Sequence, residues 1–121
     1  MNRIKFTHLW DKLTEPEFTT IRSWNPDKEK YYKSLKGQKF QVLKVKTQFS
    51  FYPEYTICHA YLSAVQVMDP KEIDINLLRR DVTINGVVNK EWYGKILNMN
   101  RVILLTFQSP SFYWIIIKEG E

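Results

Sequence analysis

The fold is predicted most directly by one short stretch, Phe18-Thr19-Thr20-Ile21-Arg22-Ser23-Trp24. All of its residues except one arginine and one serine are aromatic or β-branched, and such residues favour a β-strand. Because strand side chains alternate between two faces, Thr20, Arg22 and Trp24 are predicted to share a face. A hydroxyl, a guanidinium and an indole in line suit a nucleotide, since Arg matches phosphate and Trp can stack on a base. The alternative is a half-buried strand whose Arg22 pairs with a nearby carboxylate.

Other strands and helices are predicted on both sides of this stretch. The predicted strands cover residues 4–9, 18–24, 39–47, 55–68, 101–108 and 112–118, and the long one at 55–68 is expected to bend or bulge. The predicted helices cover 28–35, a segment from Asp69-Pro70 to about Arg80, and 90–97 behind an Asn89 cap. Asn85-Gly86 predicts a turn. Strands outnumber helices and do not alternate with them as in parallel α/β folds. We therefore expect an α+β domain, a small mixed, mostly antiparallel β-barrel with two or three flanking helices.

Length and composition narrow the class of protein. A chain of 121 residues predicts one domain, 1–121, and 44% hydrophobic with 15% aromatic residues is too apolar for a disordered chain. The single cysteine, Cys58, excludes an intrachain disulfide and predicts a reducing, cytoplasmic compartment. No apolar run approaches the roughly 20 residues that span a bilayer, and the first residues have no apolar signal core. We therefore expect no association with a membrane.

Positive charge is concentrated in one fifth of the chain, residues 22–46. The whole chain has 18 Lys and Arg against 13 Asp and Glu, a net charge of +5. The segment 22–46 has eight cations and only two anions, Asp27 and Glu29, and so a net charge of +6. The remainder of the chain has a net charge of −1 and is close to neutral. Concentrated charge suits an anionic partner such as an RNA backbone, although a solvated lysine-rich surface is the alternative. The cations of the segment are Arg22, Lys28, Lys30, Lys33, Lys36, Lys39, Lys44 and Lys46.

Other motifs for chemistry are weak. His8 and His59 lie in separate predicted strands without acidic residues at metal-ligand spacing, and Cys58 next to His59 would point to the opposite face of its strand. The four glycines are scattered singly, which disfavours a phosphate-binding loop. The sequence therefore predicts no metal site and no cofactor.

A second candidate surface is rich in aromatic residues. Phe49, Phe51, Tyr52 and Tyr55 follow shortly after Lys44 and Lys46. Cations interleaved with aromatic rings suit single-stranded nucleic acid. The alternative is that these rings cover the rim of the barrel.

The element order and the strand around Arg22 resemble those of ASCH domains in the PUA-like superfamily. Three segments carry the resemblance: Thr20-Ile21-Arg22 followed by Trp24, the glycine turn and strand at 36–42, and the later half at 67–107. The resemblance implies a five- or six-stranded barrel with a cleft beside the Arg22 strand, and RNA or nucleotide binding in that cleft. Thr20, Arg22 and Trp24 would contact the ligand there, and the lysines of 28–46 would attract phosphate.

The same family implies an enzymatic alternative. Some small bacterial ASCH proteins deacylate acetylated cytidine with a Lys, a Thr and a Glu. Their motif is Gly, any residue, Lys, two residues, Thr or Glu, any residue, Arg. On this chain Thr20 and Arg22 match the motif, whereas Glu15 replaces its Gly and Glu17 replaces its Lys. That Lys would help to activate the Thr hydroxyl or hold an oxyanion.

We therefore predict an RNA- or nucleotide-binding domain without catalytic activity and keep two alternatives. One is an amidohydrolase acting on N4-acetylcytidine or a related nucleoside. In it Thr20 would be the catalytic residue, as the nucleophile or the group that positions it. Lys44 or Lys46 would replace the missing Lys, and a carboxylate such as Glu54 or Glu72 would be the base. The other is a protein-interaction module for an acidic partner.

Overall fold

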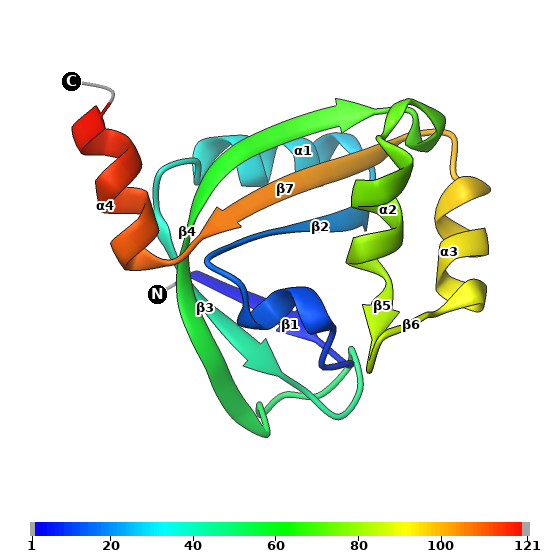
Figure 1. Cartoon of the computed structure of the whole chain (residues 1–121), viewed down its shortest axis with the longest axis horizontal. Helices are drawn as coiled ribbons and strands as arrows, with labels where there is room; N and C mark the ends of the chain where they lie inside the picture. The colour runs from blue at the N-terminus through cyan, green and yellow to red at the C-terminus, as the bar shows by residue number, and fades with distance from the viewer. Residues whose placement is uncertain (1, 120–121) are drawn as a thin grey trace.

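The computed structural model describes residues 2–119 and contains a strongly curved five-stranded sheet (Figure 1). The strand order is β1-β3-β4-β7-β2, in which β1 and β3 are parallel and all other neighbours are antiparallel. A two-stranded hairpin of β5 and β6 lies beside it. The strands are β1 Asn2–Phe6, β2 Glu17–Ser23, β3 Lys39–Lys44, β4 Tyr55–Met68, β5 Thr83–Ile84, β6 Val87–Val88 and β7 Val102–Gln108.

Short polar caps fix where the helices begin. Asn25 accepts a hydrogen bond from the Lys28 amide at 2.7 Å, and Asn89 accepts one from the Trp92 amide at 2.9 Å. Asp74 caps the helix that follows it. The α-helices are α1 Pro26–Ser34, α2 Ile75–Asp81, α3 Lys90–Leu97 and α4 Pro110–Glu119, with 3-10 turns η1 Asp11–Thr14 and η2 Pro70–Glu72.

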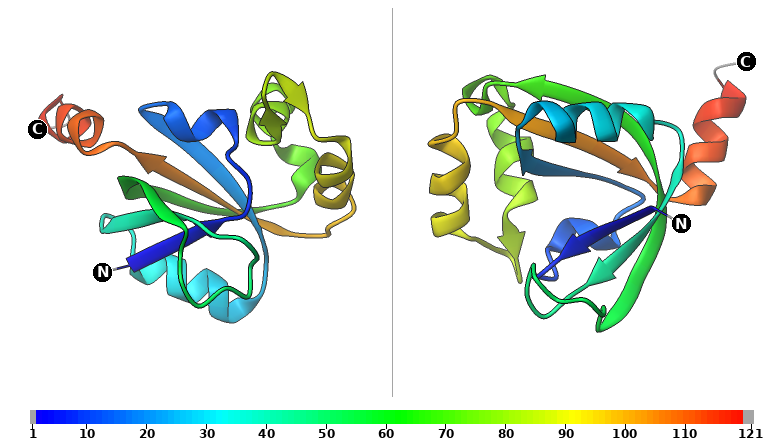
Figure 2. Two further views of the ribbon diagram at one scale, coloured as in Figure 1. Left: turned by 90° about the horizontal axis from the view of Figure 1, so that it is seen from below. Right: turned by 180° about the vertical axis from the view of Figure 1, so that it is seen from behind.

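The long strand β4 makes the sheet curve. Its first half pairs with β3 and its second half pairs with β7, and both pairings contain a register shift. Such bulges bend a strand and increase its twist. The core lies inside the curve, where Phe40, Leu62, Leu105 and Phe107 are fully buried. Helix α1 lies on the opposite side of the sheet from η1 (Figure 2), while α2 and α3 lie beyond one end of it.

The sheet is mixed and mostly antiparallel, as predicted, but it is not closed into a barrel. The edge strands β1 and β2 have no backbone pairing with each other in the described part of the chain. A side chain joins them instead, because Nη2 of Arg22 in β2 donates to the carbonyl oxygen of Lys5 in β1 at 3.0 Å.

The predicted final strand at 112–118 is wrong, because these residues form helix α4. Strand β7 already pairs with β4 on one side and β2 on the other, so no edge of β7 is free for a hairpin with this segment. A short apolar run also cannot be assigned to helix or strand by periodicity alone. The predicted helix from Pro70 to about Arg80 is interrupted as well. It consists of η2 and α2, and Asp74 starts the second. None of the helices among residues 2–119 is long and apolar enough to cross a membrane.

Candidate functional site

A cavity of about 570 Å³ lies between the edge strand β2, the end of β1, the loop after β3, and the helices α2 and α3. This volume falls in the range of small-molecule sites, roughly 300–1,000 Å³. The unpaired edge of β2 contributes a continuous wall from Thr20 to Ser23. The cavity therefore lies beside the strand in which the sequence predicted a site.

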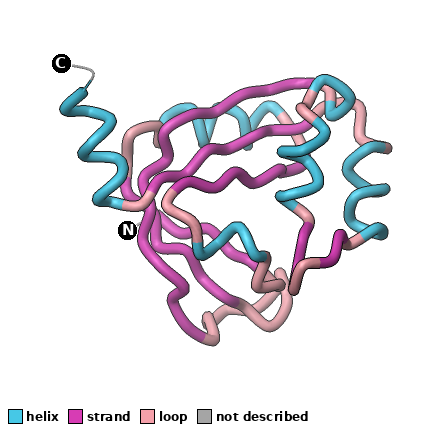
Figure 3. The backbone as a smooth tube through the Cα atoms, viewed as in Figure 1, coloured by secondary structure: helices cyan, strands magenta, loops and turns pink. Residues whose placement is uncertain are grey.

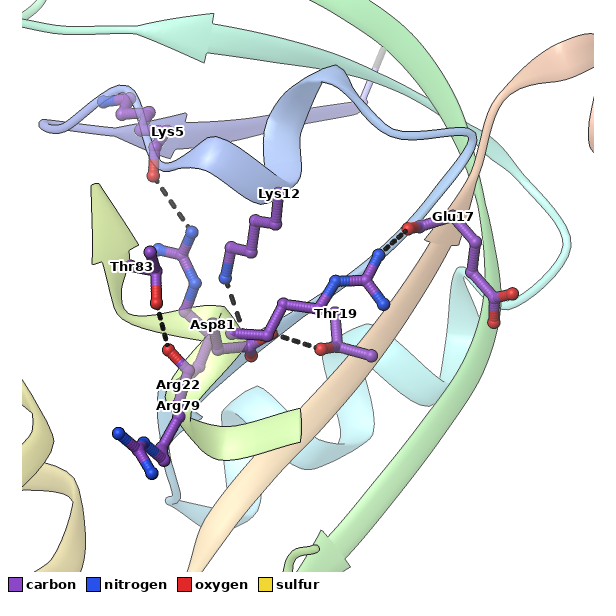
Figure 4. Close-up of polar contacts among 9 residues, drawn as sticks. Lys5, Lys12, Glu17, Thr19, Arg22, Arg79, Asp81 and Thr83 are labelled. Atoms are coloured by element: carbon purple, nitrogen blue, oxygen red, sulfur yellow. Dashed lines mark hydrogen bonds and ion pairs between the residues drawn. The ribbon is translucent and has the colours of Figure 1, made fainter. Parts of the chain in front are cut away.

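Arg22 lies in this wall without a carboxylate partner. Its guanidinium carbon is 4.8 Å from the centre of the Phe6 ring. Its Nη2 donates to the Lys5 carbonyl, as Figure 4 shows. Its Nε is buried and has no hydrogen-bond partner among residues 2–119. Burial lowers the pKa of Arg22, yet an arginine side chain stays charged in proteins. The described part of the chain has no ion pair at Arg22, so the predicted alternative of a carboxylate-paired arginine is not observed.

A buried ion pair forms another wall. Nζ of Lys12 lies 3.5 Å from Oδ2 of Asp81, and both side chains are 3% exposed. The Thr19 hydroxyl donates to the other carboxylate oxygen at 2.5 Å, so three elements, η1, α2 and β2, meet here (Figure 4). Burial lowers the pKa of Lys12 to about 8 even though Asp81 opposes this shift, and burial raises the pKa of Asp81.

Three of the cations lining the cavity have no carboxylate partner in the described structure. Lys28 donates to the Ser23 hydroxyl at 2.9 Å, and Lys5 donates to the Ser50 carbonyl at 3.4 Å. Arg22 is the third. The other two lining cations are neutralised, since Lys12 pairs with Asp81 and Lys95 with Glu91. Positive charge in the cavity therefore comes from β1, β2 and α1 together.

Aromatic rings line the same cavity. Phe6 lies under the guanidinium of Arg22. His8 and Trp10 have ring centres 5.1 Å apart, and Trp92 lies on α3 at the other side of the cavity. The cavity thus combines uncompensated cations with flat apolar surfaces.

The N-terminal turn η1 also holds the hairpin next to the cavity. The Asp11 carboxylate accepts hydrogen bonds from the amides of Asn85 at 2.8 Å and Gly86 at 2.9 Å. Both residues have positive φ angles, 52° and 77°, which a turn of this kind requires. Asp11 and Lys12 therefore fasten two consecutive elements, the hairpin and helix α2, to the same turn.

The structure brings only part of the predicted site together. Thr20, Arg22 and Lys28 line the cavity. Trp24 is engaged elsewhere, since its indole donates to Glu29 at 2.7 Å and its ring stacks against Arg101.

The remaining predicted lysines lie away from the cavity. Lys30 and Lys33 lie on helix α1 (Figure 2) but do not line the cavity, and neither does Lys36, which follows the helix. Lys39 starts β3 at the end opposite to Val45, a residue that does line the cavity. Lys44 pairs with Glu54 at 3.6 Å, and Lys46 is exposed in the following loop.

The sequence reasoning missed Lys12 and Asp81, which the fold brings to the cavity. One signal was present in the sequence. A carboxylate in the last turn of a helix interacts unfavourably with the helix dipole. Asp81 lies in the last turn of α2, after Arg79 and Arg80, and therefore indicates that a cation from elsewhere in the fold compensates its charge. Nothing in the sequence identified Lys12 as that cation. Residues 2–119 contain no group of three or more His, Cys, Asp or Glu that could hold a metal ion.

Comparisons with protein-family models, curated proteins and solved structures returned no match to this chain. The case for a function therefore depends on the residues of the cavity and on the order of the elements that form it.

Proposed function

We propose that the protein binds RNA or a nucleotide in the cavity beside β2. The observation that carries this proposal is the convergence of Lys5, Arg22 and Lys28 on a cavity that aromatic rings also line. These three cations have no carboxylate partner among the described residues. A phosphate would offset the charge of these cations, and the rings offer a surface for a base.

The state of Arg22 favours an anionic ligand over an uncharged one. Burying a cation costs free energy unless it is paired, and Arg22 has a buried Nε without a partner in the described structure. A phosphate oxygen at this nitrogen would satisfy it with a charge-assisted hydrogen bond. We also propose that the chain is an ASCH-like domain, whose curved sheet would correspond to the PUA-like barrel. Its proposed location is the cytoplasm.

Calorimetric titration with the four ribonucleoside 5′-monophosphates tests the proposal. Lys28→Ala is expected to weaken binding about tenfold, because a hydrogen bond to a charged group contributes about 1.5–3 kcal/mol. Lys30→Ala is the matched control, since it removes the same charge from the same helix but lies outside the cavity. Affinity should fall as salt rises. Equal effects of the two substitutions, or an affinity that salt leaves unchanged, would contradict the proposal.

The buried ion pair favours one second candidate, an amidohydrolase acting on N4-acetylcytidine or a related nucleoside. Lys12 and Asp81 line the cavity together with Thr20, and so supply a cation in place of the motif's missing Lys and a carboxylate in place of the predicted base. A lysine with a pKa near 8 is partly neutral at physiological pH and can accept a proton from a hydroxyl. The predicted substitutes are not in the cavity wall: Lys44 pairs with Glu54, and Glu72 is exposed on η2.

Release of acetate and cytidine from N4-acetylcytidine tests this second candidate. Thr20→Val keeps the shape of the side chain and removes its hydroxyl, so it should abolish release, whereas Thr20→Ser should retain part of it. No release by the unmodified protein at high concentration would exclude the activity and leave the binding proposal in place.

A further inference from the structure

We propose that the ligand is a single-stranded RNA, one nucleotide of which occupies the cavity while neighbouring bases stack on the loop between β3 and β4. This inference rests on the proposed function. The loop, residues 45–54, is called the aromatic loop below (Figure 3). Phe49, Phe51 and Tyr52 are 82%, 92% and 87% exposed, the highest fractions among the large hydrophobic side chains of the described residues. Clustered exposed apolar groups of this size mark interaction sites.

Hydrogen bonds order the backbone of the aromatic loop. The amide of Ser50 donates to the Thr47 carbonyl at 3.0 Å, and the Ser50 hydroxyl accepts from the Thr47 amide at 3.0 Å. The base of the loop is closed by a hydrogen bond from the Glu54 amide to the Lys44 carbonyl at 2.8 Å. Ser50 is half-buried, whereas its neighbours Phe49 and Phe51 are exposed. These bonds order the backbone that carries the exposed rings, which lowers the entropic cost of binding at this loop.

The aromatic loop is continuous with the cavity. Val45 and Gln48 belong to the loop and line the cavity. Lys5, one of the three cations without a carboxylate partner, lines the cavity and donates to the Ser50 carbonyl at 3.4 Å. A strand with one phosphate at these cations would therefore continue across this loop, where the exposed Lys46 adds a further positive charge.

Single-stranded RNA fits this surface better than a duplex or an apolar protein. Bases stack on aromatic rings when they are unpaired, and every base has a face for such stacking. In a duplex those faces are already covered by neighbouring bases. An apolar protein partner would use the rings but would not use the cations of the adjoining cavity.

Fluorescence anisotropy with a labelled, mixed-sequence RNA heptamer tests the inference. The double variant Phe51→Ala, Tyr52→Ala is expected to bind the heptamer about tenfold more weakly than the unmodified protein, since each base that stacks on an aromatic ring adds to the binding free energy. Its affinity for ribonucleoside 5′-monophosphates, measured by calorimetry, should stay within about twofold, because the rings lie outside the cavity wall. Both side chains are exposed, so thermal unfolding should be unchanged. Trp114→Ala is the matched control, as Trp114 is 60% exposed on α4.

The outcomes separate this inference from the proposed function. If the double variant binds the heptamer as tightly as the unmodified protein while monophosphates still bind, the rings serve another contact, such as one with a protein, and the inference is wrong. Equal affinity for the heptamer and for a duplex of the same sequence would also overturn it. If the unmodified protein binds neither monophosphates nor the heptamer, the proposed function itself fails.

Discussion

Lys12 and Asp81 form an ion pair that is almost completely buried, with 3.5 Å between Nζ and Oδ2 and only 3% of each side chain exposed. The two residues come from η1 and α2, so the pair connects the first turn of the chain with a helix near its middle. Water cannot solvate either charge well, and the pKa values of both are displaced toward the neutral form. The pair therefore holds α2 against η1, although removing both charges from water costs free energy.

Removing one partner of this pair should destabilise the protein more than removing both. Asp81→Leu leaves an unpaired buried ammonium and is expected to lower the free energy of unfolding by about 3–5 kcal/mol. Lys12→Met combined with Asp81→Leu should recover most of this loss, because no buried charge remains. Urea unfolding of the single and double variants measures the coupling. Lys95→Ala, which breaks the exposed pair with Glu91, is the control and should have little effect. Additive losses in the double variant would contradict the prediction.

Stability should rise with pH in the range where Lys12 loses its proton. The pKa of Lys12 is about 8 in the folded protein, against the ordinary lysine value of 10.5. Between these values the unfolded chain binds more protons at this residue than the folded one, so a rise in pH favours folding. Below about pH 8 Lys12 is protonated in both the folded and the unfolded chain, so the full free-energy cost of burying its charge lowers the stability of the fold.

Comparison with Lys12→Met isolates this effect from other groups that titrate in the same range. The free energy of unfolding of the unmodified protein, measured by urea titration at several pH values, should increase relative to the variant from about pH 8 to 10.5. The raised pKa of Asp81 has the opposite sign, since its contribution is lost as pH rises through the folded pKa. Parallel curves for the two proteins would show that Lys12 titrates normally.

The Asp11 carboxylate should control the opening of the β5–β6 hairpin. Asp11→Ala removes the acceptor for the amides of Asn85 and Gly86 and is expected to cost about 1.5–3 kcal/mol. Hydrogen exchange at these two amides should become much faster, while exchange in β7 should change only as far as global stability does. Glu17→Ala also removes an exposed carboxylate and serves as the control. Unchanged exchange at Gly86 in Asp11→Ala would show that the contact is not maintained in solution.

Sequence patterns predicted the fold where local chemistry decides it. The Asn89 cap, the Asn85-Gly86 turn and the long strand at 55–68 all correspond to observed features. The segment 112–118 was assigned wrongly because its fate depends on strand β7, whose two edges are occupied by distant parts of the chain. Closure of the sheet is likewise a long-range property, set by how the edge strands β1 and β2 meet.

The candidate site was predicted only along its own strand. Thr20 and Arg22 could be placed on one face of their strand because alternation along β2 is local, whereas the cleft beside that strand was only implied by the family resemblance. Lys5, Lys12 and Asp81 come from three other elements, so only the tertiary fold brings them together. The concentration of charge at 22–46 does not by itself locate the cavity, since most of those lysines lie outside its wall and Lys5 is not among them.

Arg22 should determine how binding of the RNA heptamer depends on salt. Each phosphate contact to a single strand contributes about 0.7 to the slope of log K against log salt concentration. Arg22→Gln should therefore reduce the slope by about that amount and weaken binding at low salt, because Gln has neither the charge nor the planar fork. Lys30→Gln removes the same charge outside the cavity and should leave the slope nearly unchanged. Arg22 also joins β1 to β2, so near-UV circular dichroism must first show that the variant is folded. A folded Arg22→Gln with the slope of the unmodified protein would mean that no phosphate is bound at Arg22.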